Sequence, residues 1–147
     1  MHEELVVDEA MIPFKGRLGF KQYMKDKPTK WGIKVLVLVD SRNGYVYVKC
    51  IQIYTGKNLE LSKNEVGLAS NVVLELLEVL EQTNPKVYVD IYYSSPALFV
   101  KLWTKSINAC GTVRGSRKHY PTDLLVQKVD RGYYDFICKK PTKKVHS

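Results

Sequence analysis

The stretch VLVLVDSRNGYVYV, at residues 35–48, decides the fold. Its first five residues are all apolar, which is typical of a strand covered on both faces. The Asn-Gly pair that follows tolerates the positive φ angles of a tight turn. Residues 45–54 are rich in Tyr, Val and Ile, so we expect them to return as a second strand, antiparallel to the first.

Another apolar strand is predicted upstream, at residues 5–7, and would complete an antiparallel meander of three strands. Downstream, SKNE at residues 62–65 fits a capping box, in which Ser and Glu side chains satisfy free N–H groups at a helix start. Apolar residues then recur every three or four positions as far as Leu80. They predict an amphipathic helix that ends near residues 84–85.

The remaining residues alternate strand and helix patterns. Residues 87–89 are apolar, and SSP at residues 94–96 predicts a second helix, because Ser caps a helix and Pro suits its first turn. Further strands are predicted at residues 109–113 and 133–138. Antiparallel strands one to three, then helix, strand, helix and strand, predict an α/β fold with a ribonuclease-H-like mixed sheet.

The composition is that of a folded domain with a basic surface. Of 147 residues, 45% are hydrophobic and 26% are charged, which is ordinary globular usage. The net charge of +8 favours a polyanionic partner, either nucleic acid or an acidic membrane. We expect no membrane insertion and no secretion, because no apolar run approaches the ~20 residues of a spanning helix and the opening MHEE is unlike a signal peptide.

Three widely spaced cysteines complete the compositional picture. Cys50, Cys110 and Cys138 form no Cys-x-x-Cys pair, which argues against a disulfide framework and against a zinc knuckle. Each lies in an apolar stretch, so we expect buried, reduced thiols.

Two aspartates each directly follow a predicted strand. Asp8 comes after residues 5–7 and Asp90 after residues 87–89, and the predicted fold makes these strands neighbours. Carboxylates at adjacent strand ends suit hard divalent cations such as Mg²⁺, and a two-metal site can stabilise both reacting oxygens of phosphoryl transfer. The alternative is that each Asp only begins a turn.

Other polar residues point to structural roles. Asp40 precedes SRNG and is expected to start a turn. Glu9 would face away from Asp8, which favours a core or salt-bridge role. No positioned partner for His119 as a catalytic base is evident in the sequence.

Several longer motifs resemble the catalytic domain of piggyBac-type transposases. VDEAMIPFKGR at residues 7–17 is similar to the opening of that domain, and YMKDKPTKWGIK at residues 23–34 is similar to its Lys-Pro-x-Lys-x-Gly-x-Lys block. Shorter matches follow, in the same order, at residues 54–57, 90–95 and 109–118. Several collinear blocks are far more specific than one short motif.

The resemblance implies a DDE transposase, which cuts and rejoins DNA at TTAA targets with a divalent metal, Mg²⁺ or Mn²⁺. By this resemblance Asp8 and Asp90 correspond to the first two catalytic, metal-binding aspartates. The third lies beyond an insertion after the fifth strand, and this chain stops before that insertion and before the last catalytic helix. The resemblance also implies a nuclear location and transposon ends as the DNA partner.

Two features depart from the family pattern. Ile91 stands where the family usually has Asn, and the basic segment KKPTKKVHS at residues 139–147 has no clear counterpart. We therefore expect residues 1–138 to form a partial transposase catalytic domain and residues 139–147 to form a disordered basic tail.

Basic residues in the first quarter of the chain lie among aromatic residues, a combination that suits phosphate contacts and base stacking. The alternative is an ordinary solvated face with buried aromatics. The residues expected to contact DNA are Lys15, Arg17, Lys27, Lys30, Arg114, Arg117 and Lys118.

Two classes of function stay open at this point. In the first, the chain is part of a DDE transposase that binds DNA and metal but, with two of three carboxylates, does not catalyse transposition alone. In the second, it is a domesticated, non-catalytic module for DNA binding or protein interaction. Association as a homodimer, or with the remainder of a longer transposase, is compatible with both.

Overall fold

The computed structural model describes residues 4–56, 66–78, 80, 84–125, 131–134, 136 and 138, with the side chains of residues 47–50, 68, 124 and 125 left out. The predicted tail at residues 139–147 and the predicted capping box at residues 62–65 lie outside this set. The elements, in chain order, are β1 (Glu4–Pro13), β2 (Gln22–Tyr23), β3 (Trp31–Asp40), β4 (Val46–Ile53), α1 (Leu68–Leu77), β5 (Lys86–Val89), α2 (Pro96–Thr104), β6 (Asn108–Gly111) and the 3₁₀ turn η1 (Thr122–Leu125).

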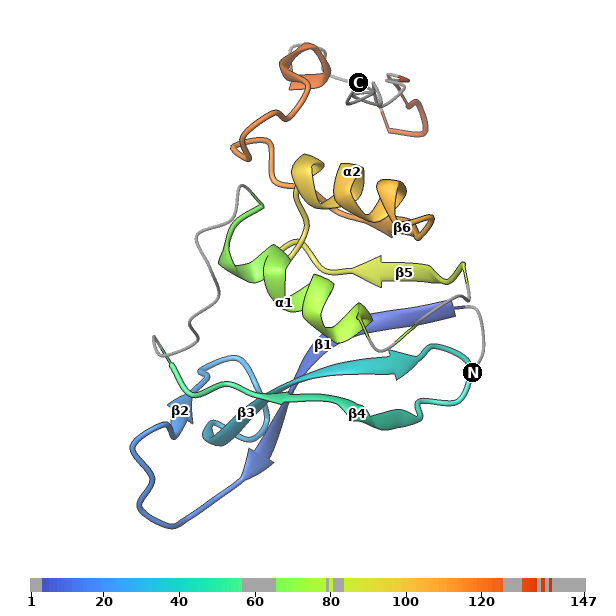
Figure 1. Ribbon diagram of the computed structural model, residues 1–147. Coiled ribbons are helices and arrows are strands. Elements are labelled where there is room, and N and C mark those ends of the chain that lie inside the picture. The colour runs from blue at the N-terminus through green and yellow to red at the C-terminus, as the bar shows by residue number, and fades with distance from the viewer. Residues whose placement is uncertain are drawn as a thin grey trace.

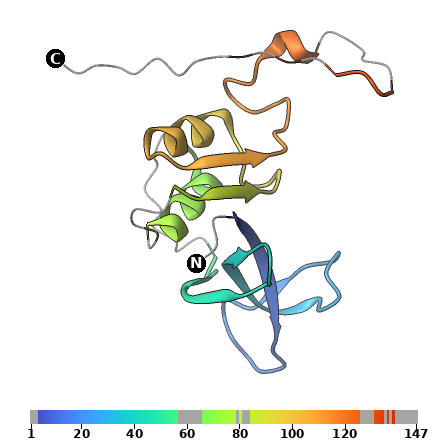
Figure 2. The same ribbon diagram turned by 90° about the vertical axis from the view of Figure 1, so that its right-hand side faces the viewer.

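The strands form one mixed sheet in the order β2-β3-β1-β5-β6, with β4 also paired to β3 (Figure 1). β3 runs antiparallel to β1, β2 and β4, whereas β5 runs parallel to both β1 and β6. The turned view in Figure 2 shows the antiparallel strands below, and β5, β6 and the two helices above. The predicted α/β, ribonuclease-H-like order, with its antiparallel meander β1-β3-β4, is confirmed.

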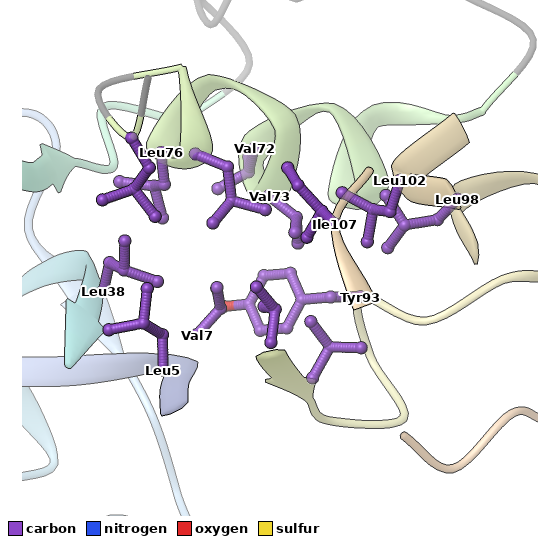
Figure 3. Close-up of a cluster of buried hydrophobic side chains, with 14 of the residues drawn as sticks. Leu5, Val7, Leu38, Val72, Val73, Leu76, Tyr93, Leu98, Leu102 and Ile107 are labelled. Carbon is purple, nitrogen blue, oxygen red and sulfur yellow. The ribbon is translucent and has the colours of Figure 1, made fainter. Parts of the chain in front are cut away.

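Both helices pack on the same face of the sheet. Their apolar residues join alternate residues of β1, β3 and β5 in one core (Figure 3). This core includes Leu5, Val7, Leu36, Leu38, Val72, Val73, Leu76, Val87, Val89, Tyr93, Leu98 and Leu102. Because side chains alternate between the two faces of a strand, Asp8 lies on the face opposite the helices, next to the buried Val7.

The start of α2 and the turn after β3 follow the sequence predictions. The Ser95 hydroxyl caps α2 by accepting from the Leu98 N–H at 3.1 Å, with Pro96 in the first turn. Asp40 starts the turn after β3, because its carboxylate accepts from the Arg42 N–H at 3.0 Å. Gly44 closes that turn at φ 70°, a conformation that favours glycine.

The first helix differs from its prediction at both ends. α1 begins at Leu68 rather than at residues 62–65, and it ends at Leu77 rather than near residue 84. Its N-cap residue is Gly67, with φ 85° and no side-chain hydrogen bond. The apolar pattern continues past the end of the helix, because residues outside a helix can also be buried. Leu80, which follows the helix, is only 8% exposed.

The predicted strand at residues 133–138 is wrong for the residues described there. Tyr133, Tyr134, Phe136 and Cys138 lie outside any strand and are exposed. Aromatic composition favours a strand only where a neighbouring strand and a buried face exist. The two-residue strand β2 went unpredicted, since it is too short to produce an alternating pattern.

The prediction of buried thiols is also wrong for the cysteines whose side chains are described. Cys110 and Cys138 are free and exposed, and the side chain of Cys50 is outside the described set. Cys110 is exposed because it lies on β6, the last strand of the sheet. Among the described helices, none has the length and apolar content needed to cross a membrane.

Candidate metal site and nucleic-acid surface

Asp8 and Asp90 lie next to each other at one end of the parallel strand pair. The last paired residues of β1 and β5 are Val7 and Val89, and each aspartate is the next residue along its chain. Neighbouring strands are about 4.8 Å apart, and both aspartates are exposed. The prediction that the two strands are neighbours is therefore confirmed, and the fold brings these carboxylates to the same edge.

Asp8 is held within a long strand. β1 continues past it to Pro13, and its antiparallel register with β3 places Asp8 opposite Val37. One carboxylate oxygen accepts from the Glu9 N–H at 2.7 Å, which ties the side chain to the backbone of the strand. The position of Asp8 is thus set by the sheet itself.

Asp90 begins a turn that leads into α2. Its backbone carbonyl accepts from the N–H groups of Tyr93 at 3.0 Å and Ser94 at 3.1 Å. The Ser94 hydroxyl donates to the carbonyl of Thr112, just after β6. The turn from Asp90 to Ser94 is therefore attached to the chain that leaves the neighbouring strand.

Glu9 lies on the face of β1 opposite Asp8, as predicted, which is the face that the helices cover, and it forms two kinds of contact. Its carboxylate accepts from the Tyr93 hydroxyl at 2.9 Å and lies 3.7 Å from the Lys27 ammonium. Burial, and then the nearby negative charge of Glu9, raise the pKa of Tyr93 well above its ordinary value. The hydroxyl therefore stays protonated and available as a donor to Glu9. The sequence pattern does not single out Tyr93, because an aromatic residue close to an Asp is not a distinctive motif.

The donor chemistry of Asp8 and Asp90 fits a hard divalent cation. Mg²⁺ takes oxygen ligands and is often bound through one or two protein carboxylates together with water and substrate phosphates. In the part of the chain that the structure describes, no group of three or more His, Cys, Asp or Glu residues could hold a metal ion. Among the described residues, the candidate ligands at this place are therefore these two carboxylates.

The predicted basic residues fall into two groups. Lys15, Arg17 and Lys30 are exposed and lie near the β1–β2 and β2–β3 connections. Arg114 and Lys118 are exposed and follow β6, whose register pairs Gly111 with Val89 and so ends at the same edge as Asp90. The segment that carries the second group therefore leaves the sheet next to the strand that Asp90 follows.

Lys27 and Arg117 differ from these residues because both are half-buried. Lys27 pairs with Glu9, and the Arg117 guanidinium donates to the carbonyls of Tyr92 at 2.7 Å and Ile91 at 3.5 Å. Arg117 thus holds the turn that begins at Asp90. His119 lies in the same segment, exposed and at φ 66°.

An exposed aromatic pair lies among the basic residues of the first group. The rings of Tyr23 and Trp31 are 4.9 Å apart, and the Lys21 ammonium lies 5.4 Å from the centre of the Trp31 ring. Tyr23 is 52% and Trp31 is 56% exposed. Both rings are therefore accessible, which is unlike the buried aromatics of the alternative interpretation.

Comparison with known proteins supports one family. Residues 1–146 match the family model described as Transposase IS4. The chain is 32% identical to the human PiggyBac transposable element-derived protein 3 over 88% of its length, and 26% identical to the human PiggyBac transposable element-derived protein 2 over 87%. It spans 22% of the length of each of these relatives.

A solved structure agrees with this assignment. The chain matches the protein in a cryo-EM structure of a piggyBac transposase synaptic complex with hairpin DNA, with a TM-score of 0.72 and 27% identity. The match covers 90% of this chain and 27% of that one. The chain therefore belongs to the Transposase IS4 family of DDE transposases, and within it to the piggyBac-like transposases.

Proposed function

We propose that this chain contributes metal-binding and DNA-binding residues to the catalytic core of a piggyBac-like transposase. The observation that carries the proposal is the parallel pairing of β1 with β5, which brings Asp8 and Asp90 to the same sheet edge. Residues 1–138 are the portion that we assign to this catalytic core, and we assign residues 139–147 to a basic tail.

Asp8 and Asp90 would hold the divalent cation, Mg²⁺ or Mn²⁺. When bound, such an ion neutralises charge that develops on phosphate oxygens during phosphoryl transfer. Asp8 would supply a carboxylate positioned by the pairing of β1 with β3, and Asp90 a carboxylate at the start of the turn that leads to α2. Both are exposed, which leaves room for a phosphate and for water.

The exposed cations would bind the phosphate backbone of DNA. Lys15, Arg17 and Lys30 supply one group and Arg114 and Lys118 the other. Phosphate contacts fix position and orientation without reading sequence, so these residues are suited to guide DNA toward the aspartates. We expect a smaller contribution from Lys27 and Arg117, whose charged groups already make contacts within the protein.

The aromatic pair Tyr23 and Trp31 would add stacking to these contacts. Exposed rings can stack on unpaired bases of any sequence. The relative with a solved structure is described in a complex with hairpin DNA, which supports DNA as the partner class for this chain as well. The proposal also includes transposon ends and TTAA targets as the DNA partner, and a nuclear location. It further includes association as a homodimer or with the remainder of a longer transposase.

We expect the chain to be inactive in transposition by itself. Two carboxylates can hold one cation, but a second cation in a two-metal site would lack a fixed protein ligand. The chain corresponds to about a fifth of the relatives' length. We therefore expect the activity of a whole transposase to need a longer protein. Metal-dependent cutting of transposon-end DNA by this chain alone would contradict the expectation.

Metal binding can be tested directly by titrating the chain with Mn²⁺ and following the free ion by electron paramagnetic resonance. Asp8→Asn and Asp90→Asn should each weaken binding by at least ~10-fold, since each removes one charged ligand. Asp26→Asn is the matched control, because Asp26 is also an exposed aspartate but lies in the loop before β3. Equal affinity in all three variants would reject the metal site.

DNA binding can be tested by fluorescence anisotropy on a labelled duplex at several salt concentrations. Binding should weaken steeply with salt, and each phosphate contact removed should reduce the log–log slope by about 0.9. Lys15→Ala, Arg17→Ala and Lys118→Ala should show this reduction. Lys86→Ala is the control, because Lys86 is exposed at the opposite, amino end of β5.

The two tests together separate the two classes of function. A transposase core should bind both Mn²⁺ and DNA. A domesticated DNA-binding module would bind DNA with the same salt dependence while Mn²⁺ affinity stays unaffected by Asp8→Asn and Asp90→Asn. Loss of DNA binding in the Lys86→Ala control would instead reject the assigned surface.

A further inference from the structure

The backbone ladder between the two aspartate-bearing segments stops just before the aspartates. β1 and β5 pair as far as Val7 and Val89. β1 then continues to Pro13 beside β3, whereas the segment after β5 turns at Asp90. The two segments therefore separate at the point where their carboxylates would have to be held at a defined distance.

A side-chain hydrogen bond spans this point of separation. The Tyr93 hydroxyl donates to the Glu9 carboxylate at 2.9 Å. Glu9 is the residue after Asp8, and Tyr93 is bound through its own N–H to the carbonyl of Asp90. The hydrogen bond thus joins the residue next to Asp8 to a residue whose backbone is hydrogen-bonded to Asp90, across 84 positions of sequence.

Both ends of this link are fixed within the fold. The Tyr93 ring is 1% exposed and packs in the core beside Val7 (Figure 3). The Glu9 side chain is only 17% exposed, and the Lys27 ammonium, 3.7 Å from its carboxylate, also donates to the Glu9 carbonyl at 3.5 Å. Because both side chains are held in this way, the hydrogen bond between them can fix the position of the Asp90 turn relative to β1.

We propose that Tyr93 and Glu9 are positioning residues that set the separation of Asp8 and Asp90 for a divalent cation. This inference rests on the metal site of the proposed function. Neither residue needs to touch the ion, since the Tyr93 hydroxyl is already bound to Glu9. Residues that orient metal ligands typically change metal affinity by about 10- to 100-fold when they are substituted.

The test compares the Mn²⁺ affinity of Tyr93→Phe, Tyr92→Phe and the unmodified chain by the same resonance titration. Tyr93→Phe keeps the buried ring and removes only the linking hydroxyl, and it should weaken Mn²⁺ binding by about 10-fold. Tyr92→Phe is the matched control, because it removes a hydroxyl from the adjacent, 51% exposed ring. Its affinity should equal that of the unmodified chain.

Glu9→Gln provides a graded variant. The amide oxygen of Gln can still accept from the Tyr93 hydroxyl, while the charge that attracts Lys27 is lost. Its Mn²⁺ affinity should therefore lie between those of the unmodified chain and Tyr93→Phe. A Tyr93→Phe affinity equal to that of the unmodified chain would overturn the proposal.

Backbone hydrogen exchange without metal supplies a readout that does not depend on Mn²⁺ binding. In Tyr93→Phe, exchange should accelerate at the N–H groups of Tyr93 and Ser94 and in β1 beyond Asp8, while α1 keeps its protection. If the unmodified chain binds no Mn²⁺, the proposed metal site fails, and the exchange pattern alone decides whether the link holds the two segments. Unchanged exchange in both segments would overturn the link as well.

Discussion

Asp8 and Asp90 lie side by side but are held in place by different parts of the structure. Asp8 belongs to a ten-residue strand with paired neighbours on both sides. Asp90 follows a four-residue strand and starts a turn. That turn is held by the Arg117 guanidinium, the Ser94 hydroxyl and the Tyr93 hydroxyl.

The two halves of this candidate metal site therefore depend on two kinds of structural support. A backbone ladder holds Asp8, and such a ladder tolerates many side-chain changes because its hydrogen bonds are made by the main chain. The Asp90 turn depends on particular side chains that come from β1 and from the segment after β6. Substitutions should therefore affect the two halves of the site unequally.

The largest effect is expected from loss of core packing beneath the Asp90 turn. Leu98 is fully buried in α2, directly after that turn, and Leu98→Ala should lower the free energy of unfolding by about 2–5 kcal/mol. Leu38→Ala, at a fully buried position of β3, should cost a similar amount. Urea unfolding measures both.

Mn²⁺ affinity of the folded variants then distinguishes the two halves. Leu98→Ala should weaken Mn²⁺ binding, because α2 and the Asp90 turn shift together, whereas Leu38→Ala should leave the affinity of the folded protein unchanged. Equal weakening in both variants would show that the two halves of the site do not depend on separate supports.

An intermediate effect is expected at two glycines that lie against neighbouring strands. A Cβ at Gly111 would meet the carbonyl of Val89, and a Cβ at Gly32 would meet the carbonyl of Ile12. Gly111→Ala and Gly32→Ala should each destabilise the fold by about 1–3 kcal/mol, because backbone must move. Thermal unfolding would establish both values.

Only one of these glycines is close to the Asp90 turn. Gly111 pairs with the residue just before Asp90, so Gly111→Ala should also weaken Mn²⁺ binding. Gly32 lies beside the far end of β1, and Gly32→Ala should lower stability alone. A change of Mn²⁺ affinity in Gly32→Ala would contradict this assignment.

The smallest effect is expected from two ion pairs made by β1, one at its first residue and one near its middle. Lys27 lies 3.7 Å from Glu9 with its side chain 34% exposed, and Lys86 lies 3.7 Å from Glu4 with its side chain 51% exposed. Lys27→Met and Lys86→Met should each cost only about 0.2–1 kcal/mol. The Lys27 pair should be the stronger, since it is less exposed to solvent.

Salt provides the check on this ranking. Raising the ionic strength should reduce the cost of Lys86→Met more than that of Lys27→Met, because exposed pairs are screened more strongly. Urea unfolding at low and high salt measures the difference. A larger cost for Lys86→Met than for Lys27→Met would reverse the expected order.

Patterns along the chain were sufficient to predict most of the architecture. The apolar run at residues 35–39 and the turn begun by Asp40 predict β3 and its return strand, because alternation and turn chemistry are local properties. The cap at Ser95 predicts α2 for the same reason. Local patterns did not predict β2, and they wrongly predicted a strand for the described residues of the segment 133–138. In both places, pairing with other parts of the sheet decides whether a strand forms.

The candidate site was predictable only in part. Each aspartate follows a strand in the sequence, and the order of elements makes those strands neighbours. Glu9 was expected to face away from Asp8 because strand side chains alternate. Tyr93 was not predicted, and Arg117 was expected to contact DNA, whereas its guanidinium also binds the carbonyls of the Asp90 turn.

The sequence by itself determined most of the strands and helices, the basic charge and the two aspartates that follow strands, since these depend on neighbouring residues and on composition. Only the tertiary structure decided which side chains meet across the sheet. The Tyr93 hydroxyl reaches Glu9, and Arg117 reaches Tyr92, because β1, β5 and β6 lie side by side in the sheet. Contacts between residues 25 and 84 positions apart depend on the packing of the whole sheet, and no local pattern encodes them.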